Sequence, residues 1–197
     1  MIVRLSTPNT PRRRLSAAAR REVIEQAATE VFAERGYQGA SIDEIARRSG
    51  VSPPVVYDHF ASKEELHRRL LERQRDELVA FWAARMPIPE GTSALEGLLD
   101  AYFAYVEAHP YAYRMYFRDT THRDIQQQGT RLLATILAQQ PGWEDSGEAE
   151  LEMATEVMRT GLIGLALWWQ EHPGVTRAAV VAAAMRALSM ASPRAAS

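Results

Sequence analysis

Residues 41–63 read SIDEIARRSGVSPPVVYDHFASK, and this stretch decides the fold that we expect. Ser41 is a good N-cap for a short helix, whose apolar positions form one stripe at helical spacing. Gly50 can then take the positive φ of a tight turn at no steric cost. Ser52 can cap a second short helix with Pro53 at its first position, where a missing N–H costs nothing. Two short helices joined by a glycine turn predict a helix-turn-helix, and its second helix has the right size for the major groove of DNA.

The composition suits a folded protein of the cytoplasm. The 197 residues are 46% hydrophobic, which is ample for a buried core, and they include no cysteine, which excludes disulfides and Cys-ligated zinc. No apolar run reaches the ~18 residues that span a bilayer, and the basic N-terminus lacks the apolar region of a signal peptide. We therefore expect a cytoplasmic location and no contact with a membrane.

Positive charge is concentrated at the end of the chain that carries the helix-turn-helix. The net charge is −2, but residues 1–60 hold 9 basic and 7 acidic side chains, whereas residues 61–197 hold 14 and 18. Six arginines and no acidic residue lie within residues 1–21. This distribution favours contact of the N-terminal end with DNA phosphates. The alternative is an arginine-rich tail without a role, because disordered tails are often charged.

Helical periodicity and Pro/Gly breakers divide the chain into helices, and no segment has the alternation of a strand. The expected helices are 16–35, 42–49, 53–60, 63–85, 92–109, 111–118, 122–140, 146–171 and 176–191. The fold class is therefore all-α, with an N-terminal three-helix head joined through a long helix to a larger bundle. The expected domains are a disordered basic arm (1–15), the head (16–62), the bundle (63–191) and a disordered tail (192–197).

The head closely resembles the DNA-binding region of TetR-family transcriptional regulators, which are tetracycline-repressor-like proteins. The matching residues are Ile24, Ala27, Ala28, Phe32, Gly36, Tyr37, Ser41, Ile42, Ile45, Ala46, Gly50, Val51, Ser52, Tyr57, His59, Phe60, Lys63 and Leu66. They cover about residues 18–66, and the run Tyr57-x-His59-Phe60-x-x-Lys63 is nearly diagnostic.

The resemblance implies a homodimer that represses transcription from a palindromic operator and is released by a small molecule. It makes residues 63–191 a ligand-binding and dimerisation bundle. It also implies that Ser41, Tyr57, His59 and Lys63 contact phosphates, while the helix start at 52–57 meets base edges.

Base readout by this head should be sparse, because Pro53 and Pro54 begin the second helix and neither can donate a hydrogen bond. Pro54 and Val55 can still contact thymine methyls, and the Ser52 side chain is left to cap the N–H of Val55. Specificity would then lean on DNA shape and on the arginines of the basic arm in a minor groove. We also expect Asp58 to pair with Arg47 or Arg48. The expected DNA-binding residues are Arg12, Arg13, Arg14, Ser41, Ser52, Pro54, Val55, Tyr57, His59 and Lys63.

Large apolar and aromatic residues are frequent in residues 92–172. One interpretation is the core of the bundle, and the other is a mostly apolar ligand pocket with a few polar groups that orient a small, largely apolar or aromatic effector. The expected ligand-binding residues are Tyr102, Phe103, Val106, His109, Tyr113, Tyr116, Phe117, Met158 and Trp168.

The last two helices have the composition of a dimer interface. Gly161, Gly164 and Ala166 let backbones approach closely, while Met153, Val157, Leu165 and Trp168 supply apolar surface. Alanines give the final helix a smooth apolar face, which could instead pack within the monomer. Two-fold symmetry matches palindromic DNA, so we favour the homodimer.

Catalysis and metal binding find no support in the sequence. The five histidines (59, 67, 109, 122 and 172) have no metal-ligand spacing, and no nucleophile lies near a base. We therefore expect no enzyme, no metal and no cofactor. The alternative to an effector-released repressor is a helix-turn-helix dimer with no small-molecule effector, which a protein partner regulates.

Overall fold

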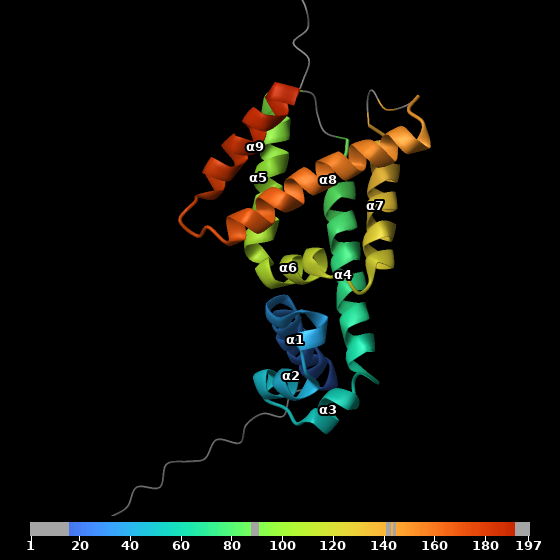
Figure 1. Ribbon diagram of the computed structural model, residues 1–197, viewed down its shortest axis with the longest axis vertical. Helices are drawn as coiled ribbons and strands as arrows, with labels where there is room; N and C mark the ends of the chain where they lie inside the picture. Colours follow the sequence, from blue (N-terminus) through green and yellow to red (C-terminus); the bar gives the residue numbers. More distant parts are fainter. Residues whose placement is uncertain (1–15, 88–90, 141–142, 144, 192–197) are drawn as a thin grey trace, which may run out of the picture.

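The computed structural model describes residues 16–87, 91–140, 143 and 145–191, and this part of the chain is helical without a strand. Its helices are α1 (Ala17–Gly39), α2 (Ile42–Ser49), α3 (Pro53–Tyr57), α4 (Lys63–Ala83), α5 (Thr92–Ala108), α6 (Pro110–Arg118), α7 (Arg123–Leu137), α8 (Glu148–Gln170) and α9 (Arg177–Ala191). The head, α1–α3, lies at one end of the molecule, and α4 leads from it into the bundle of α5–α9 (Figure 1). The prediction of an all-α fold with a helix-turn-helix head and a C-terminal bundle is confirmed.

Short sequence signals set the ends of the head helices. The Ser16 side chain accepts a hydrogen bond from the N–H of Ala19 (3.1 Å), and Ser41 accepts one from Glu44 (3.2 Å). Gly36 and Gly50 have φ of 66° and 70°, which glycine adopts without strain. The chain breaks its helical course at Gly36, and the further turn after this kink carries α1 to Gly39, beyond the predicted end.

Helix α3 begins at Pro53, as predicted, but its first turn is capped from the main chain. The N–H of Val55 donates to the carbonyl of Ser52 (3.0 Å), and the Ser52 hydroxyl makes no capping bond within the described chain. The prediction that the Ser52 side chain caps Val55 is wrong, because the tight turn already brings the Ser52 carbonyl to that N–H. Helix α3 also ends at Tyr57, three residues before the predicted end.

One apolar core joins the head to α4, α6 and α7. Ile24, Phe32 and Ile45 of the head pack in one buried cluster with Leu66 and Leu70 of α4. The same cluster includes Met115 and Tyr116 of α6 and Ile125 of α7. We call this cluster the junction core, since it lets α6 pack directly on α1. The head thus packs against α6 of the bundle and is also connected to the bundle through α4.

A second buried cluster, the bundle core, lies among α4, α5, α6, α8 and α9. It consists of Phe81, Leu99, Tyr102, Phe103, Val106, Tyr113, Ala166, Trp169, Val180, Val181 and Ala184. The indole N–H of Trp169 donates to the carbonyl of Val175 (2.7 Å), which fixes the turn between α8 and α9. None of the helices in the described ranges is long and apolar enough to cross a membrane.

The junction core has a polar edge. His67 of α4 is buried there, with its ring centroid 4.4 Å from Phe32 and 4.9 Å from Tyr37. Burial lowers the pKa of His67 to about 4, with smaller contributions in the same direction from His122 and Lys63 and an opposing one from Asp119. His67 is therefore a neutral imidazole at physiological pH.

Candidate nucleic-acid interface

The outer end of the head is a small polar tip built on α3. Ser52, Pro54, Tyr57 and Asp58 are exposed, and Tyr57 has 53% of its surface in solvent. Val56 points the other way and is fully buried. The tip lies at the far end of the molecule from the bundle (Figure 1), so a DNA groove can reach α3 without meeting α5–α9.

Two buried residues hold the tip in place. Val56 and Phe60 pack into the junction core, and the N–H of Phe60 donates to the carbonyl of Val56 (3.0 Å). The guanidinium of Arg21 lies 4.8 Å from the centroid of the Phe60 ring. Helix α3 has only five residues, so this packing rather than helix propensity must fix its orientation.

A side chain that contacts a phosphate must be accessible to solvent, and Ser41, Tyr57 and His59 are all at least partly exposed. The Ser41 oxygen accepts the capping bond from Glu44, which leaves its hydroxyl hydrogen to donate. Tyr57 is exposed, and His59 is half-buried beside Phe60. Val55 is half-buried next to exposed Pro54, which gives the tip a small apolar surface.

Lys63 lies in a different setting from the one predicted. Its ammonium donates to the carbonyls of Tyr37 (2.9 Å) and Ala40 (3.0 Å) and lies 4.4 Å from the centroid of the Tyr37 ring. These contacts connect the start of α4 to the last turn of α1 and to Ala40 just after it. Two of its three donors are therefore used within the protein, and one remains for a phosphate.

The two arginines of α2, Arg47 and Arg48, differ in their ion pairs and in their exposure. Arg48 binds Glu34 (2.6 Å) and Glu44 (2.9 Å), and its hydrogen bonds lower the pKa of both carboxyl groups. The expected pair between Asp58 and Arg47 or Arg48 is therefore wrong for Arg48, which α1 and α2 already neutralise. The side chain of Arg47 is 74% exposed, and its guanidinium lies 3.9 Å from the Glu44 carboxylate, a longer contact than either ion pair of Arg48. Arg47 is a candidate phosphate contact that the sequence analysis missed, because the sequence does not show which arginine of a pair is neutralised.

Other predicted contacts lie outside this region. Arg12, Arg13 and Arg14 fall outside the described residues. In the bundle, Tyr102, Phe103, Val106 and Tyr113 do come together, with Phe117 packed against them.

In the present conformation the side chains of Tyr102, Phe103, Val106 and Tyr113 are buried against one another. The Tyr102 and Tyr113 hydroxyls bond to each other, and burial raises the pKa of both. The other residues predicted to bind a ligand lie elsewhere. Tyr116 belongs to the junction core, while His109, Met158 and Trp168 are exposed. The nine residues thus do not line one cavity, because their helices direct them to two cores and to solvent.

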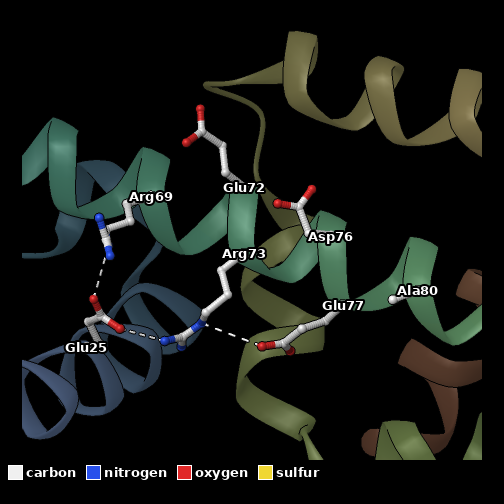
Figure 2. A pocket seen from close by; sticks show the side chains of 7 residues that line it. All are labelled: Glu25, Arg69, Glu72, Arg73, Asp76, Glu77 and Ala80. Atoms are coloured by element: carbon white, nitrogen blue, oxygen red, sulfur yellow. Dashed lines mark hydrogen bonds and ion pairs between the residues drawn. The ribbon is translucent and has the colours of Figure 1, made fainter.

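A charged cavity of about 460 Å³ lies between α1 and α4 (Figure 2). Glu25 of α1 binds Arg69 (3.2 Å) and Arg73 (2.6 Å) of α4, and Arg73 also approaches Glu77 (3.7 Å). Glu72 and Asp76 add further negative charge to its wall. A second cavity of about 120 Å³ lies between α4 and α7, beside Met86 and Ile136. Six of the seven residues that line the first cavity are charged, which does not suit an apolar ligand. The second cavity is smaller than the ~300 Å³ typical of ligand sites.

Comparison with known proteins agrees with this arrangement. Residues 24–70 match the family model described as bacterial regulatory proteins, tetR family. The chain is similar to the HTH-type transcriptional activator FasR of Mycolicibacterium smegmatis, with 40% identity over 107 residues. That match covers 54% of this chain and 49% of FasR, so the chain spans about half the length of this curated relative.

Two solved structures share the fold. A TetR-like transcriptional regulator from Rhodococcus sp. RHA1 superposes with a TM-score of 0.68 at 20% identity, covering 91% of this chain and all of that one. The regulator FadR of Bacillus subtilis, solved in complex with stearoyl-CoA, has a TM-score of 0.65 at 16% identity and covers 84% and 95% of the two chains. At these identities the likeness concerns the fold.

Proposed function

Because the chain belongs to the tetR family of bacterial regulatory proteins, we propose that it is a homodimeric repressor that leaves its operator when an effector molecule with a largely apolar part binds. The observation that carries this proposal is the exposed tip of α3 on a rigid base within the family's DNA-binding region. The relatives and the structural neighbours described above are transcriptional regulators, and we propose no catalytic activity.

The tip would enter the major groove and grip the backbone on both sides. Ser41, Tyr57 and His59 supply hydrogen-bond donors, and the Arg47 guanidinium supplies a positive charge. Pro54 and Val55 would contact thymine methyls, and Arg12, Arg13 and Arg14 would reach a minor groove. Such a head makes few base-specific hydrogen bonds, so much of its specificity would come from DNA shape.

The homodimer is proposed from an apolar strip along α8. Met153, Val157, Gly161, Gly164 and Trp168 follow one another at intervals of three or four residues, and all are exposed. We call them the α8 strip. A monomer would leave this surface in water, and a second copy related by a two-fold axis would cover it. Ala166 faces the bundle core, so it is not part of the strip.

For the effector we propose a molecule with a long acyl chain, of which stearoyl-CoA is the first to test. FadR of Bacillus subtilis, which shares the fold, was solved with that compound. The bundle core supplies the apolar side chains that an acyl chain needs, including Phe103, Val106 and Tyr113. Binding would have to separate these residues, so the effector would favour a second conformation of the bundle.

The junction core provides the route from effector to DNA. Helix α6 carries Tyr113 in the bundle core and Met115 in the junction core, and it packs on α1. A shift of α6 would therefore tilt the head. In a dimer this changes the spacing of the two heads, which must match major grooves ~34–36 Å apart or a multiple of that distance.

The test is a titration of operator DNA, selected from a random library, with and without stearoyl-CoA. We expect stearoyl-CoA, but not free CoA, to raise the melting midpoint and to weaken operator binding at least tenfold. A reporter gene reads the sign of regulation, which needs its own measurement because FasR is named an activator. If no acyl-CoA changes either the midpoint or operator binding, the proposed effector is wrong, and a protein partner becomes the next candidate.

A further inference from the structure

Three potential metal ligands meet at the polar edge of the junction core. They are His67 of α4 and Asp119 and His122 of the connection between α6 and α7. One ligand atom from each lies within 4.8 Å of the other two. The side chains of His67 and Asp119 are 2% and 3% exposed, and His122 is also buried.

Both histidines keep a buried nitrogen without a hydrogen-bond partner. Nδ1 of His67 and Nδ1 of His122 find no partner among the described residues. Leaving a buried polar atom unpaired costs about 1–3 kcal/mol, so native proteins seldom do so without a reason. A neutral imidazole carries a lone pair on one ring nitrogen and an N–H on the other, and a metal ion requires the lone pair.

Asp119 is already oriented for a ligand role. Its Oδ2 accepts hydrogen bonds from the N–H groups of Thr121 (3.1 Å) and His122 (2.7 Å). Its Oδ1 lies 3.6 Å from Nε2 of His67, which is beyond a good hydrogen bond. Ligands of a tetrahedral ion with bonds of ~2.0–2.1 Å are about 3.4 Å apart, so this pair is close to the required spacing.

We propose that His67, Asp119 and His122 bind a divalent transition-metal ion. Two imidazoles and a carboxylate suit Zn²⁺, Co²⁺, Ni²⁺ or Fe²⁺, whereas Mg²⁺ and Ca²⁺ prefer oxygen ligands alone. Rotation of the side chains that shortens the longest separation by up to about 1.4 Å brings all three ligand atoms to this spacing. Three protein ligands leave a position open for water.

The ion would add a connection between helices at the junction core, where head and bundle meet. His67 belongs to α4 and touches Phe32 and Tyr37 of α1, whereas Asp119 and His122 follow α6. A bound ion would therefore link α4 to the connection between α6 and α7, next to Phe32 and Tyr37 of α1. Nothing in this site depends on the effector or the operator, so it can be tested on the protein alone.

The experiment is a Co²⁺ titration of tag-free, chelator-treated full-length protein, followed by Zn²⁺ competition. We expect one Co²⁺ per chain with visible absorption bands, displacement by Zn²⁺, and a higher melting midpoint with either ion. His122→Gln and Asp119→Asn should each weaken binding by a factor on the order of 100 or more. His172→Gln is the matched control, since His172 is an exposed histidine of the connection between α8 and α9 and is not one of the three proposed ligands, and it should bind as the unaltered chain does.

Two results would overturn the proposal. One is the absence of stoichiometric Co²⁺ or Zn²⁺ binding to the unaltered protein. The other is equal binding by the His122→Gln, Asp119→Asn and His172→Gln variants. Asp119→Asn keeps an oxygen for the N–H groups of Thr121 and His122, so this variant should fold, and circular dichroism checks that it does.

Discussion

The head and the bundle present two opposite kinds of surface. The tip of α3 is polar, small and backed by a closed core, whereas the α8 strip is apolar and open to solvent. The polar tip needs no second chain to support it, because its base packs in the junction core of the same chain. An apolar strip is stable only when something covers it. We infer that the first surface meets DNA and the second meets another copy of the chain, and the following predictions test that contrast in order of expected effect.

Placing a charge in the α8 strip should have the largest effect. Val157→Glu would bury an unpaired carboxylate from each copy, at a cost of about 3–5 kcal/mol per charge. The variant should sediment as a folded monomer and lose operator binding. Leu132→Glu is the control, because Leu132 is a 45%-exposed apolar residue of α7 outside the strip. A Val157→Glu protein that remains dimeric would show that the strip is not the interface.

Removing the base of the tip should come next. Phe60→Ala takes a fully buried ring from the junction core and should lower the free energy of unfolding by about 3–5 kcal/mol. Denaturant titration measures this loss. Tyr57→Ala is the comparison, since Tyr57 is exposed: it should weaken DNA binding and leave stability within about 0.5 kcal/mol. Equal losses of stability in the two variants would contradict the division between base and tip.

The ion network of Figure 2 should contribute a smaller amount. Glu25 has a side chain only 10% exposed and binds Arg21, Arg69 and Arg73, so it joins α1 to α4. Glu25→Gln should cost about 1–2 kcal/mol, because water screens the half-exposed arginines. Glu30→Gln on the same helix is the control. No change in the unfolding midpoint of Glu25→Gln would show that packing alone seats α1 on α4.

The smallest effects should distinguish two cations of the head. Arg47→Gln should leave stability unchanged and reduce the slope of log affinity against log salt by ~1 per contact. Lys63→Met should instead lower stability, since it deprives the carbonyls of Tyr37 and Ala40 of a donor. The comparison fails if Lys63→Met changes only the salt slope and Arg47→Gln only the stability.

Local signals made the head predictable from its sequence. Caps at Ser16 and Ser41 and turns at Gly36 and Gly50 act over three or four residues, and each lies where the pattern indicates. The errors come from competition that a pattern does not show. The Ser52 carbonyl accepts the hydrogen bond from the N–H that its hydroxyl was expected to cap, and Glu34 and Glu44 already bind the Arg48 that was expected to pair with Asp58.

The bundle was less predictable because its properties depend on distant residues. Aromatic content indicated a core, but only packing decides that Tyr113 and Tyr116, on one helix, enter different cores. In the sequence, His67 and His122 are separated by the rest of α4 and by α5 and α6. The two histidines therefore form no metal-ligand motif of fixed spacing. In the fold the two rings are 5.3 Å apart.

The most direct test of the central claim is selection of DNA by the full-length chain from a random library, followed by measurement of the stoichiometry on the enriched sequence. We predict a palindrome with half-sites ~10–10.5 base pairs apart or a multiple of that, bound by pairs of chains. Binding should be weakened in Tyr57→Ala and lost in Val157→Glu. Enrichment of a sequence without two-fold symmetry, or equal binding by the Val157→Glu monomer, would contradict it.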